Sequence, residues 1–340
     1  MELTKIDGSF GEGGGQIIRS AVTLAAITGK PIQVENIRKN RKVPGLRPQH
    51  ILGIKILAKI CQARVEGLHV NSTSLSFAPS QGISMELQED VGTAGSIPLI
   101  LQVLIPAVSL MKKSLNISVT GGTDVPWSPT SNYTKFVLGE AYSRIGMDFT
   151  LEIRKRGYYP KGGGIIESNI SPCNNLKALS LVKKTTKSTK FLCSYSKLPK
   201  DQIENEVKKA RGFLEKSGFH CEYSVTEDDV IDKGCSFLVY SHDNDSVVGV
   251  DAIYEKTLNG IGEHVASKFV ESNLGADLFL SDMLVVPLSL IQDTSVFRIK
   301  QITKHLETNL FVASKITGCK YGIGKIDDGF EVRIAGSSDP

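Results

Sequence analysis

One order of secondary-structure elements, β-α-β-α-β-β, recurs along this 340-residue chain. Hydrophobic periodicity and turn residues predict it first over residues 2–78. The elements are expected at 2–6, 14–28, 31–37, 45–61, 64–70 and 74–78. The pattern therefore predicts an α/β (α+β) protein built from repeated units.

The same order is predicted twice more. A second set of elements is expected at 84–88, 96–112, 116–120, 131–145, 147–155 and 164–169. A third set follows at 278–291, 296–302, 304–317, 319–325 and 329–334, and we expect its missing first strand near 178–182. Residues 1–180 and 273–340 would then form a large domain of three units, with residues 181–272 as a smaller inserted α/β domain.

The predicted insert begins with a polar, lysine-rich segment at 183–190. Such a run is typical of a solvated linker, and contact with nucleic acid is the alternative. An amphipathic helix is expected at 201–217, followed by strands at 221–226, 236–241 and 247–252. The insert is thus predicted to have its own small core.

The composition indicates an ordinary soluble globular protein, with 41% hydrophobic and 22% charged residues. A net charge of +4 permits polyanion binding without requiring it. Neither a signal peptide nor an apolar run of transmembrane length is recognised, so we expect a cytoplasmic protein that does not contact membranes. The six cysteines form no C-x-x-C pair and are expected to be free thiols. A disulfide among Cys193, Cys221 and Cys235 is the alternative.

The segment 8–19 combines a glycine turn with Glu12 and Arg19 at a predicted strand-to-helix junction. Glycines let a backbone approach a ligand closely, and the free N–H groups of a starting helix attract anions. Arg19 lies about two helical turns beyond Glu12 and could reach the same ligand. The segment therefore outlines a phosphate and metal site, with a glycine turn plus a structural salt bridge as the alternative. Its spacing matches neither a P-loop nor a dinucleotide fingerprint.

Five cations lie within residues 38–47, at the start of the second predicted helix. Arginine forks bind phosphate oxygens, and a helix N-terminus adds positive potential. The segment from Pro44 to Pro48 is rigid and fixes where these charges point. An exposed charged loop is the alternative.

His305 is placed near the start of the helix predicted at 304–317, with Thr303 as a candidate N-cap. The positive helix end disfavours imidazolium, so we expect a neutral, nucleophilic ring near pH 7. Asn309 lies on the same helix face and could orient a bound group. Asp282 occupies an apolar helix and needs a cation or a metal as partner. The alternatives are a structural histidine and a half-exposed helical aspartate.

Two further glycine-containing loops fall at junctions equivalent to those of the glycine run and the basic loop. Residues 92–96 include Gly95 and Ser96, and residues 121–127 include Pro126. Residues 158–164 are predicted to form a β-turn carrying an aromatic pair, either structural or stacked on a base.

Six of these segments resemble, in order, the motifs of the RNA 3'-terminal phosphate cyclase family, in its archaeal-type or bacterial-type catalytic form. They are 11–16 with Arg19, 38–50, 92–96, 121–124, 159–164 and 305–309. The resemblance implies three β-α-β-α-β-β units with an inserted domain. It also implies ATP-dependent, ligase-type conversion of an RNA 3'-phosphate to a 2',3'-cyclic phosphate, releasing AMP and diphosphate.

The resemblance assigns roles to particular residues. His305 would be the nucleophile that forms a covalent adenylyl-histidine, and AMP would then pass to the RNA 3'-phosphate. Arg19, Arg38 and Arg41 would neutralise phosphate charge, and Glu12 would hold a divalent metal, Mg²⁺ or Mn²⁺. The remaining nucleotide-site assignments are Gln49, Gly95, Ser96, Pro126, Asp282 and Asn309. Met283 departs from the family pattern, in which Gln often follows the aspartate.

Two rival classes of function are considered. A non-catalytic relative acting in ribosome assembly would lack the nucleophile, whereas this chain retains His305. The repeated units also resemble the enolpyruvyl transferases, which act on small anionic metabolites without an adenylylated histidine, and fold analogy is a weak guide to function. The sequence leaves open the RNA substrate, the preferred metal, assembly into a homo-oligomer and the use of DNA ends or 5'-phosphates.

Overall fold

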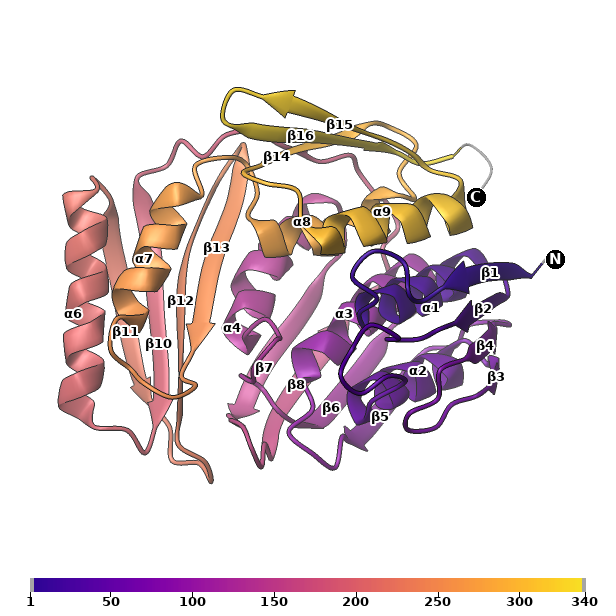
Figure 1. The fold of residues 1–340 in the computed structure, drawn as a ribbon, viewed down its shortest axis with the longest axis horizontal. Coiled ribbons are helices and arrows are strands. Elements are labelled where there is room, and N and C mark those ends of the chain that lie inside the picture. Colours follow the sequence, from indigo (N-terminus) through magenta and orange to yellow (C-terminus); the bar gives the residue numbers. More distant parts are fainter. Residues whose placement is uncertain (1–2, 338–340) are drawn as a thin grey trace.

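The computed structural model describes residues 3–337 as four mixed four-stranded sheets with helices packed on them (Figure 1). The first sheet and its helices come from the N-terminal part of the chain. Their bounds are β1 (Thr4–Asp7), α1 (Gln16–Thr28), β2 (Ile32–Glu35), α2 (Pro48–Ile60), β3 (Arg64–Glu66) and β4 (Leu75–Ala78). The strand order is β1-β2-β4-β3, with β1 and β2 parallel and the other pairs antiparallel.

The next elements form a second sheet with the same arrangement of directions. They are β5 (Met85–Asp90), α3 (Ile97–Leu110), β6 (Leu115–Gly121), α4 (Ser131–Tyr133), the π-helical turn η1 (Thr134–Leu138), α5 (Gly139–Arg144), β7 (Phe149–Lys155) and β8 (Gly164–Ile170). The order is β5-β6-β8-β7, with one parallel and two antiparallel pairs. The helix predicted at 131–145 is thus interrupted by a π-helical turn.

A third sheet joins one short strand to the C-terminal part of the chain. It comprises β9 (Ser180–Leu181), α8 (Leu278–Leu288), β14 (Ser295–Ile299), α9 (Lys304–Thr317), β15 (Lys320–Ile326) and β16 (Gly329–Ala335). The order β9-β14-β16-β15 again has one parallel and two antiparallel pairs. Figure 1 shows α8 and α9 lying along this sheet. The strand expected near 178–182 is confirmed as β9.

The fourth sheet lies at the other end of the molecule from the termini (Figure 1). Its elements are β10 (Ser188–Ser196), α6 (Lys200–Lys216), β11 (His220–Glu227), β12 (Gly234–Asp243), β13 (Ser246–Ile253) and α7 (Ile261–Glu271). The order is β11-β10-β12-β13, and the sheet has a buried hydrophobic cluster of its own that includes Phe191, Phe237 and Phe269. The other three sheets share one larger cluster, to which Leu238, Tyr240 and Val247 of the fourth sheet also belong.

The lysine-rich segment 183–190 agrees with the predicted solvated run at Lys183, Lys187 and Lys190, which are exposed, but not at Lys184. Its last residues belong to β10, and the Lys184 ammonium donates to the Phe269 carbonyl over 2.8 Å. The same ammonium lies 3.9 Å from the centroid of the Phe269 ring. Burial lowers the pKa of Lys184 to about 7. The expectation of a solvated lysine was wrong here because a long aliphatic stem and a cation–π contact let this side chain pack inward.

All six cysteines are free and buried. The sulfurs of Cys193 and Cys235 lie 3.9 Å apart on neighbouring strands. Within residues 3–337, no helix combines the length and the apolar character needed to cross a membrane.

Asp277 links the fourth sheet to the rest of the fold. Its carboxylate caps α8 by accepting the Leu280 N–H over 2.9 Å, and it also accepts the Tyr133 hydroxyl at 2.7 Å. A third bond, 2.9 Å long, comes from the N–H of Gly249 in β13. Burial raises the pKa of this carboxyl to about 6. One buried side chain therefore satisfies donors from three separate elements.

We expect Asp277→Ala to lower the free energy of unfolding by about 3 kcal/mol, because it leaves three donors without their acceptor. Chemical denaturation monitored by circular dichroism measures the change. Glu255→Ala, at an exposed position, is the matched control and should stay within about 0.5 kcal/mol of the wild type. Equal stability of the two variants would show that Asp277 does not hold these elements together.

Candidate active site

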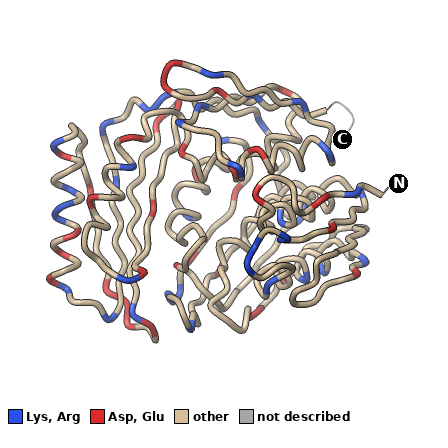
Figure 2. Tube along the Cα trace, in the orientation of Figure 1, with Lys and Arg blue, Asp and Glu red and all other residues tan. Residues whose placement is uncertain are grey.

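The candidate site lies where the loops after β1 and β2 meet the N-terminus of α9. Glycine is required at two positions of the first loop, because Gly11 and Gly13 have φ of 57° and 58°. A Cβ atom at Gly11 would lie 2.6 Å from the Thr308 hydroxyl on α9, and one at Gly13 would lie 2.6 Å from the Asn40 amide nitrogen. The glycine run thus fits between α9 and the basic loop 38–47, whose cations stand out in Figure 2.

Glu12 lies between a cation and the candidate nucleophile. One carboxylate oxygen accepts from Arg41 Nη2 over 2.5 Å, and the other contacts His305 Nε2. The structural salt bridge considered as the alternative is therefore present. It involves the basic loop and α9 rather than Arg19, and it brings Glu12, Arg41 and His305 together.

His305 is held by the start of its helix and by α8. The Thr303 hydroxyl caps α9 by accepting the Leu306 N–H at 2.9 Å, and it donates to Asp282 Oδ1 over 2.8 Å. The other Asp282 oxygen lies 3.5 Å from His305 Nδ1. Asp282 therefore has the partners that its burial demands, while Nε2 of the ring faces Glu12.

The protonation of His305 differs from the sequence-based expectation. The hydrogen bond to Asp282 raises the pKa of the ring above its ordinary value, against an opposing effect of burial. The charges of Asp282 and Glu12 raise it further, while Arg19 lowers it. The helix end was expected to disfavour the charged ring, whereas the net shift of its pKa is upward because Asp282 and Glu12 lie next to it.

Asp282→Asn should lower the pKa of His305, because it removes the hydrogen bond and the charge that raise it. Protein NMR of the His305 ring protons across the pH range measures this shift directly. Asp328→Asn, in an exposed turn, is the control and should leave the His305 titration unchanged. A superimposable titration in Asp282→Asn would contradict this assignment.

Asn309 is fully buried beneath the site. Its amide nitrogen donates to the Asp282 carbonyl over 2.8 Å, and its oxygen accepts from the Ser20 hydroxyl over 2.7 Å. These bonds tie α9 to α8 and to α1. The arrangement agrees with a residue that fixes the start of the helix, since both ends of the amide contact protein groups.

Arg19 lies beside this cluster and is half-buried, with the Nε of its guanidinium buried. Its guanidinium contacts the Gln16 amide, but its Nε is buried without a hydrogen-bond partner among the described residues. Burial, together with the charges of Arg38 and Arg41, lowers the pKa of Arg19 to about 10. A buried, incompletely satisfied cation crowded by other cations favours an anionic ligand.

Arg38 was expected to face phosphate, but its guanidinium donates to backbone carbonyls of its own loop. Its residue has a φ of 55°, and its Nη1 donates to the carbonyls of Val43 and Gly45, at 3.0 and 2.9 Å. Burial lowers its pKa, and Arg47 and Arg41 lower it further. Arg38 therefore shapes the basic loop, whereas Arg41 reaches Glu12.

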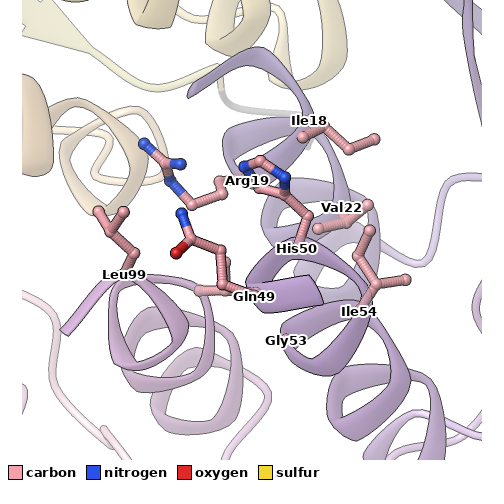
Figure 3. A pocket seen from close by; sticks show the side chains of 9 residues that line it. Ile18, Arg19, Val22, Gln49, His50, Gly53, Ile54 and Leu99 are labelled. Carbon is pink, nitrogen blue, oxygen red and sulfur yellow. The ribbon is translucent and has the colours of Figure 1, made fainter. Parts of the chain in front are cut away.

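Gln49 and Ser96 form a second group next to Arg19. The Gln49 side-chain oxygen accepts the Ser96 N–H over 3.0 Å, and the Ser96 hydroxyl caps α3 and contacts the Ser128 hydroxyl. Figure 3 shows the Arg19 guanidinium and the Gln49 amide on the same side of a small pocket. Gly95 has no room for a side chain, since its Cβ would lie 2.7 Å from Val91. Pro126 lies half-buried in the turn just before Ser128.

No role was predicted for His50, which lies in the first turn of α2. Its Nδ1 accepts the Arg47 N–H at 3.1 Å, and its Nε2 faces the backbone at Gly15. Burial and the neighbouring arginines lower its pKa to about 3. A neutral His50 thus packs under the glycine run. Its position three residues after Arg47, with Pro48 between them, is the capping signal that could have identified it.

The side chains of Arg19 and Glu12 fit a nucleoside triphosphate bound together with a divalent metal. The unpartnered Arg19 Nε suits a phosphate oxygen, and the Glu12 carboxylate suits Mg²⁺, which binds through few carboxylates together with substrate phosphates. Within residues 3–337, no group of three or more His, Cys, Asp or Glu side chains could hold a metal ion by itself. A metal here would therefore depend on the bound nucleotide.

Comparisons with known proteins define the family. A sequence profile described as "RNA 3'-terminal phosphate cyclase" matches residues 10–323. The chain is 35% identical over 335 residues to the RNA 3'-terminal phosphate cyclase of Methanococcoides burtonii, covering 98% of this chain and all of the relative. It is 38% identical over 325 residues to the protein of the same name from Thermococcus kodakarensis, covering 94% of each chain. The chain therefore belongs to the RNA 3'-terminal phosphate cyclase family.

A solved structure of EPSP synthase from Acinetobacter baumannii is a distant match. It is 13% identical, with a TM-score of 0.28, over 98% of this chain and 65% of that one. A likeness at this level supports no conclusion about fold or activity.

Proposed function

We propose that the protein converts the 3'-phosphate end of RNA to a 2',3'-cyclic phosphate, using ATP and forming AMP and diphosphate. The observation that carries the proposal is the placement of His305 Nε2 against Glu12, with Asp282 behind Nδ1. Family membership supports the same activity. His305, which a non-catalytic relative would lack, is present in this chain.

The proposed first step is attack by His305 Nε2 on the α-phosphorus of ATP. A nitrogen–phosphorus bond forms, the bond to the β-phosphate oxygen breaks, and diphosphate leaves. Asp282 at Nδ1 would stabilise the positive charge that the ring acquires. Because Nε2 contacts Glu12 in the resting protein, Glu12 must release the ring before attack.

In the proposed second step an oxygen of the RNA 3'-phosphate attacks the same phosphorus and frees His305. The terminal 2'-hydroxyl then attacks the activated 3'-phosphate, loses its proton and displaces AMP. Covalent catalysis replaces one difficult step by easier ones, since AMP leaves more readily than a bare phosphate oxygen.

The cations near His305 would neutralise negative charge on the phosphates of ATP and RNA. Arg19 and Arg41 would bind phosphate oxygens, and Arg38 would hold the basic loop in position. Glu12, once released from His305, would hold a divalent metal, Mg²⁺ or Mn²⁺, whose charge would favour the departure of diphosphate. Gln49, Gly95, Ser96 and Pro126 would border the nucleotide, and Asn309 would keep Asp282 in place.

We also propose that the first three sheets, which share one arrangement of strands, are repeated units of a single catalytic domain. This domain would be formed by residues 1–180 and 273–340. The separate hydrophobic cluster of the fourth sheet supports treating residues 181–272 as an inserted domain. A cytoplasmic location agrees with six free thiols.

The test of the proposed function uses a short RNA with a 3'-phosphate, ATP and either Mg²⁺ or Mn²⁺. We expect the RNA end to become resistant to phosphatase only when ATP is present. Acid opening of the ring should restore sensitivity, which identifies the product as a cyclic phosphate. An unchanged RNA end with both metals would overturn the proposal and favour a binding protein.

A further inference from the structure

The chain's one tryptophan, Trp127, is almost fully exposed, with 93% of its surface accessible. Its φ of 61° lies in the left-handed region, which bulky side chains rarely adopt. Single exposed apolar side chains are common, but an exposed indole on an unfavourable backbone is not. Such outliers are often kept for function.

The loop around Trp127 is firmly held, so the indole is presented from a fixed base. The Ser128 hydroxyl contacts that of Ser96, and the Thr130 N–H donates to Asp251 Oδ2 over 2.6 Å. Pro126 and Pro129 flank the segment and restrict its backbone. Since Ser96 is also bonded to Gln49, the residue next to Trp127 is linked through Ser96 to the border of the candidate active site.

A second exposed aromatic side chain comes from the neighbouring turn. Tyr159 is 63% exposed, and a β-bridge between Asp124 and Tyr158 joins its segment to the one that carries Trp127. The turn packs on the 92–96 loop, since a Cβ at Gly162 would lie 2.8 Å from Ala94 Cα. The Lys161 N–H donates to Asp232 over 2.8 Å, and its side chain is exposed. Two exposed aromatic side chains and an exposed lysine thus come from two segments that are joined by a β-bridge.

We propose that Trp127 and Tyr159 form a stacking platform for unpaired RNA bases just upstream of the reactive 3' end. The inference rests on the proposed function. Aromatic side chains bind single strands by stacking, which tolerates any base, and nearby cations contact the backbone. A mononucleotide such as ATP would instead be enclosed in a pocket. The exposure of the indole therefore favours a longer, open-ended strand as the occupant.

Because Trp127 is the one tryptophan, intrinsic tryptophan fluorescence of the wild-type protein reports on it alone. We expect a 12-nucleotide RNA with a 3'-phosphate to quench this fluorescence, and ATP with Mg²⁺ to leave it unchanged. Quenching by ATP alone would assign the indole to adenine and overturn the proposal. Absence of quenching by RNA would also overturn it. This binding measurement is independent of cyclisation, so it separates a failure here from a failure of the proposed function.

Variants of the two aromatic residues supply a second test of the platform. Trp127→Ala and Tyr159→Ala should each raise KM for the 12-nucleotide RNA about tenfold. The KM for ATP should match the wild type, and Trp127→Phe should recover most of the loss. Tyr321→Ala removes a half-exposed tyrosine from β15 and is the matched control, with kinetics like the wild type. A KM for RNA unchanged in both test variants would contradict the platform, as would an increase in the KM for ATP alone.

Discussion

His305→Ala is expected to abolish ATP-dependent cyclisation, with a loss of at least about 1,000-fold in kcat. No other side chain in the cluster can replace the ring, since Glu12 and Asp282 are carboxylates that contact its two nitrogens. The ring is partly exposed and Thr303 caps the helix, so the variant should fold normally. The measurement is the rate of cyclic phosphate formation, with circular dichroism as the test of folding.

The matched control is His264→Ala, at an exposed position on α7. It should cyclise RNA at the wild-type rate. Substantial cyclisation by a folded His305→Ala protein would exclude His305 as the nucleophile, whatever the fate of ATP.

Arg19→Met is the second prediction with a large effect, and it separates activity from stability. Adenylylation should fall by about 100-fold or more in kcat/KM, because a cation that neutralises phosphate charge is lost. The free energy of unfolding should not decrease, since Met fills similar space and removes a buried cation whose pKa burial and nearby arginines depress to about 10. Functional sites commonly carry such a cost in stability.

Both quantities are measured on one preparation, by single-turnover labelling with ATP and by chemical denaturation. Arg64→Met is the control, because Arg64 is exposed and pairs with Glu66 on β3. A loss of stability of several kcal/mol in Arg19→Met would show that the residue is structural. Adenylylation at the wild-type rate in Arg19→Met would show that Arg19 is not part of the active site.

The sequence predicted most elements because their signals are local. The bounds expected for α9 are those observed, and Thr303 is its N-cap as predicted. Glu12 of the glycine run also meets Arg41 of the basic loop and His305. Periodicity, caps and turn residues act over a few neighbours and can be recognised without knowledge of the fold.

What the sequence missed depends on partners that are distant along the chain. The raised pKa of His305 comes from Asp282 and Glu12, which folding brings to the ring. Lys184 seemed solvated because its aromatic partner Phe269 lies far along the chain. His50 is neutral because burial and arginines surround it. Each property arises from tertiary packing, which a local pattern does not encode.

The most direct test of the central claim uses ATP labelled in the α-phosphate. The purified protein is incubated with this ATP and a divalent metal, then denatured and treated with acid or alkali. We predict a covalent label that acid removes and alkali does not, as expected for AMP on a histidine, and that is missing from His305→Ala. No label with either Mg²⁺ or Mn²⁺, or full labelling of His305→Ala, would contradict the account.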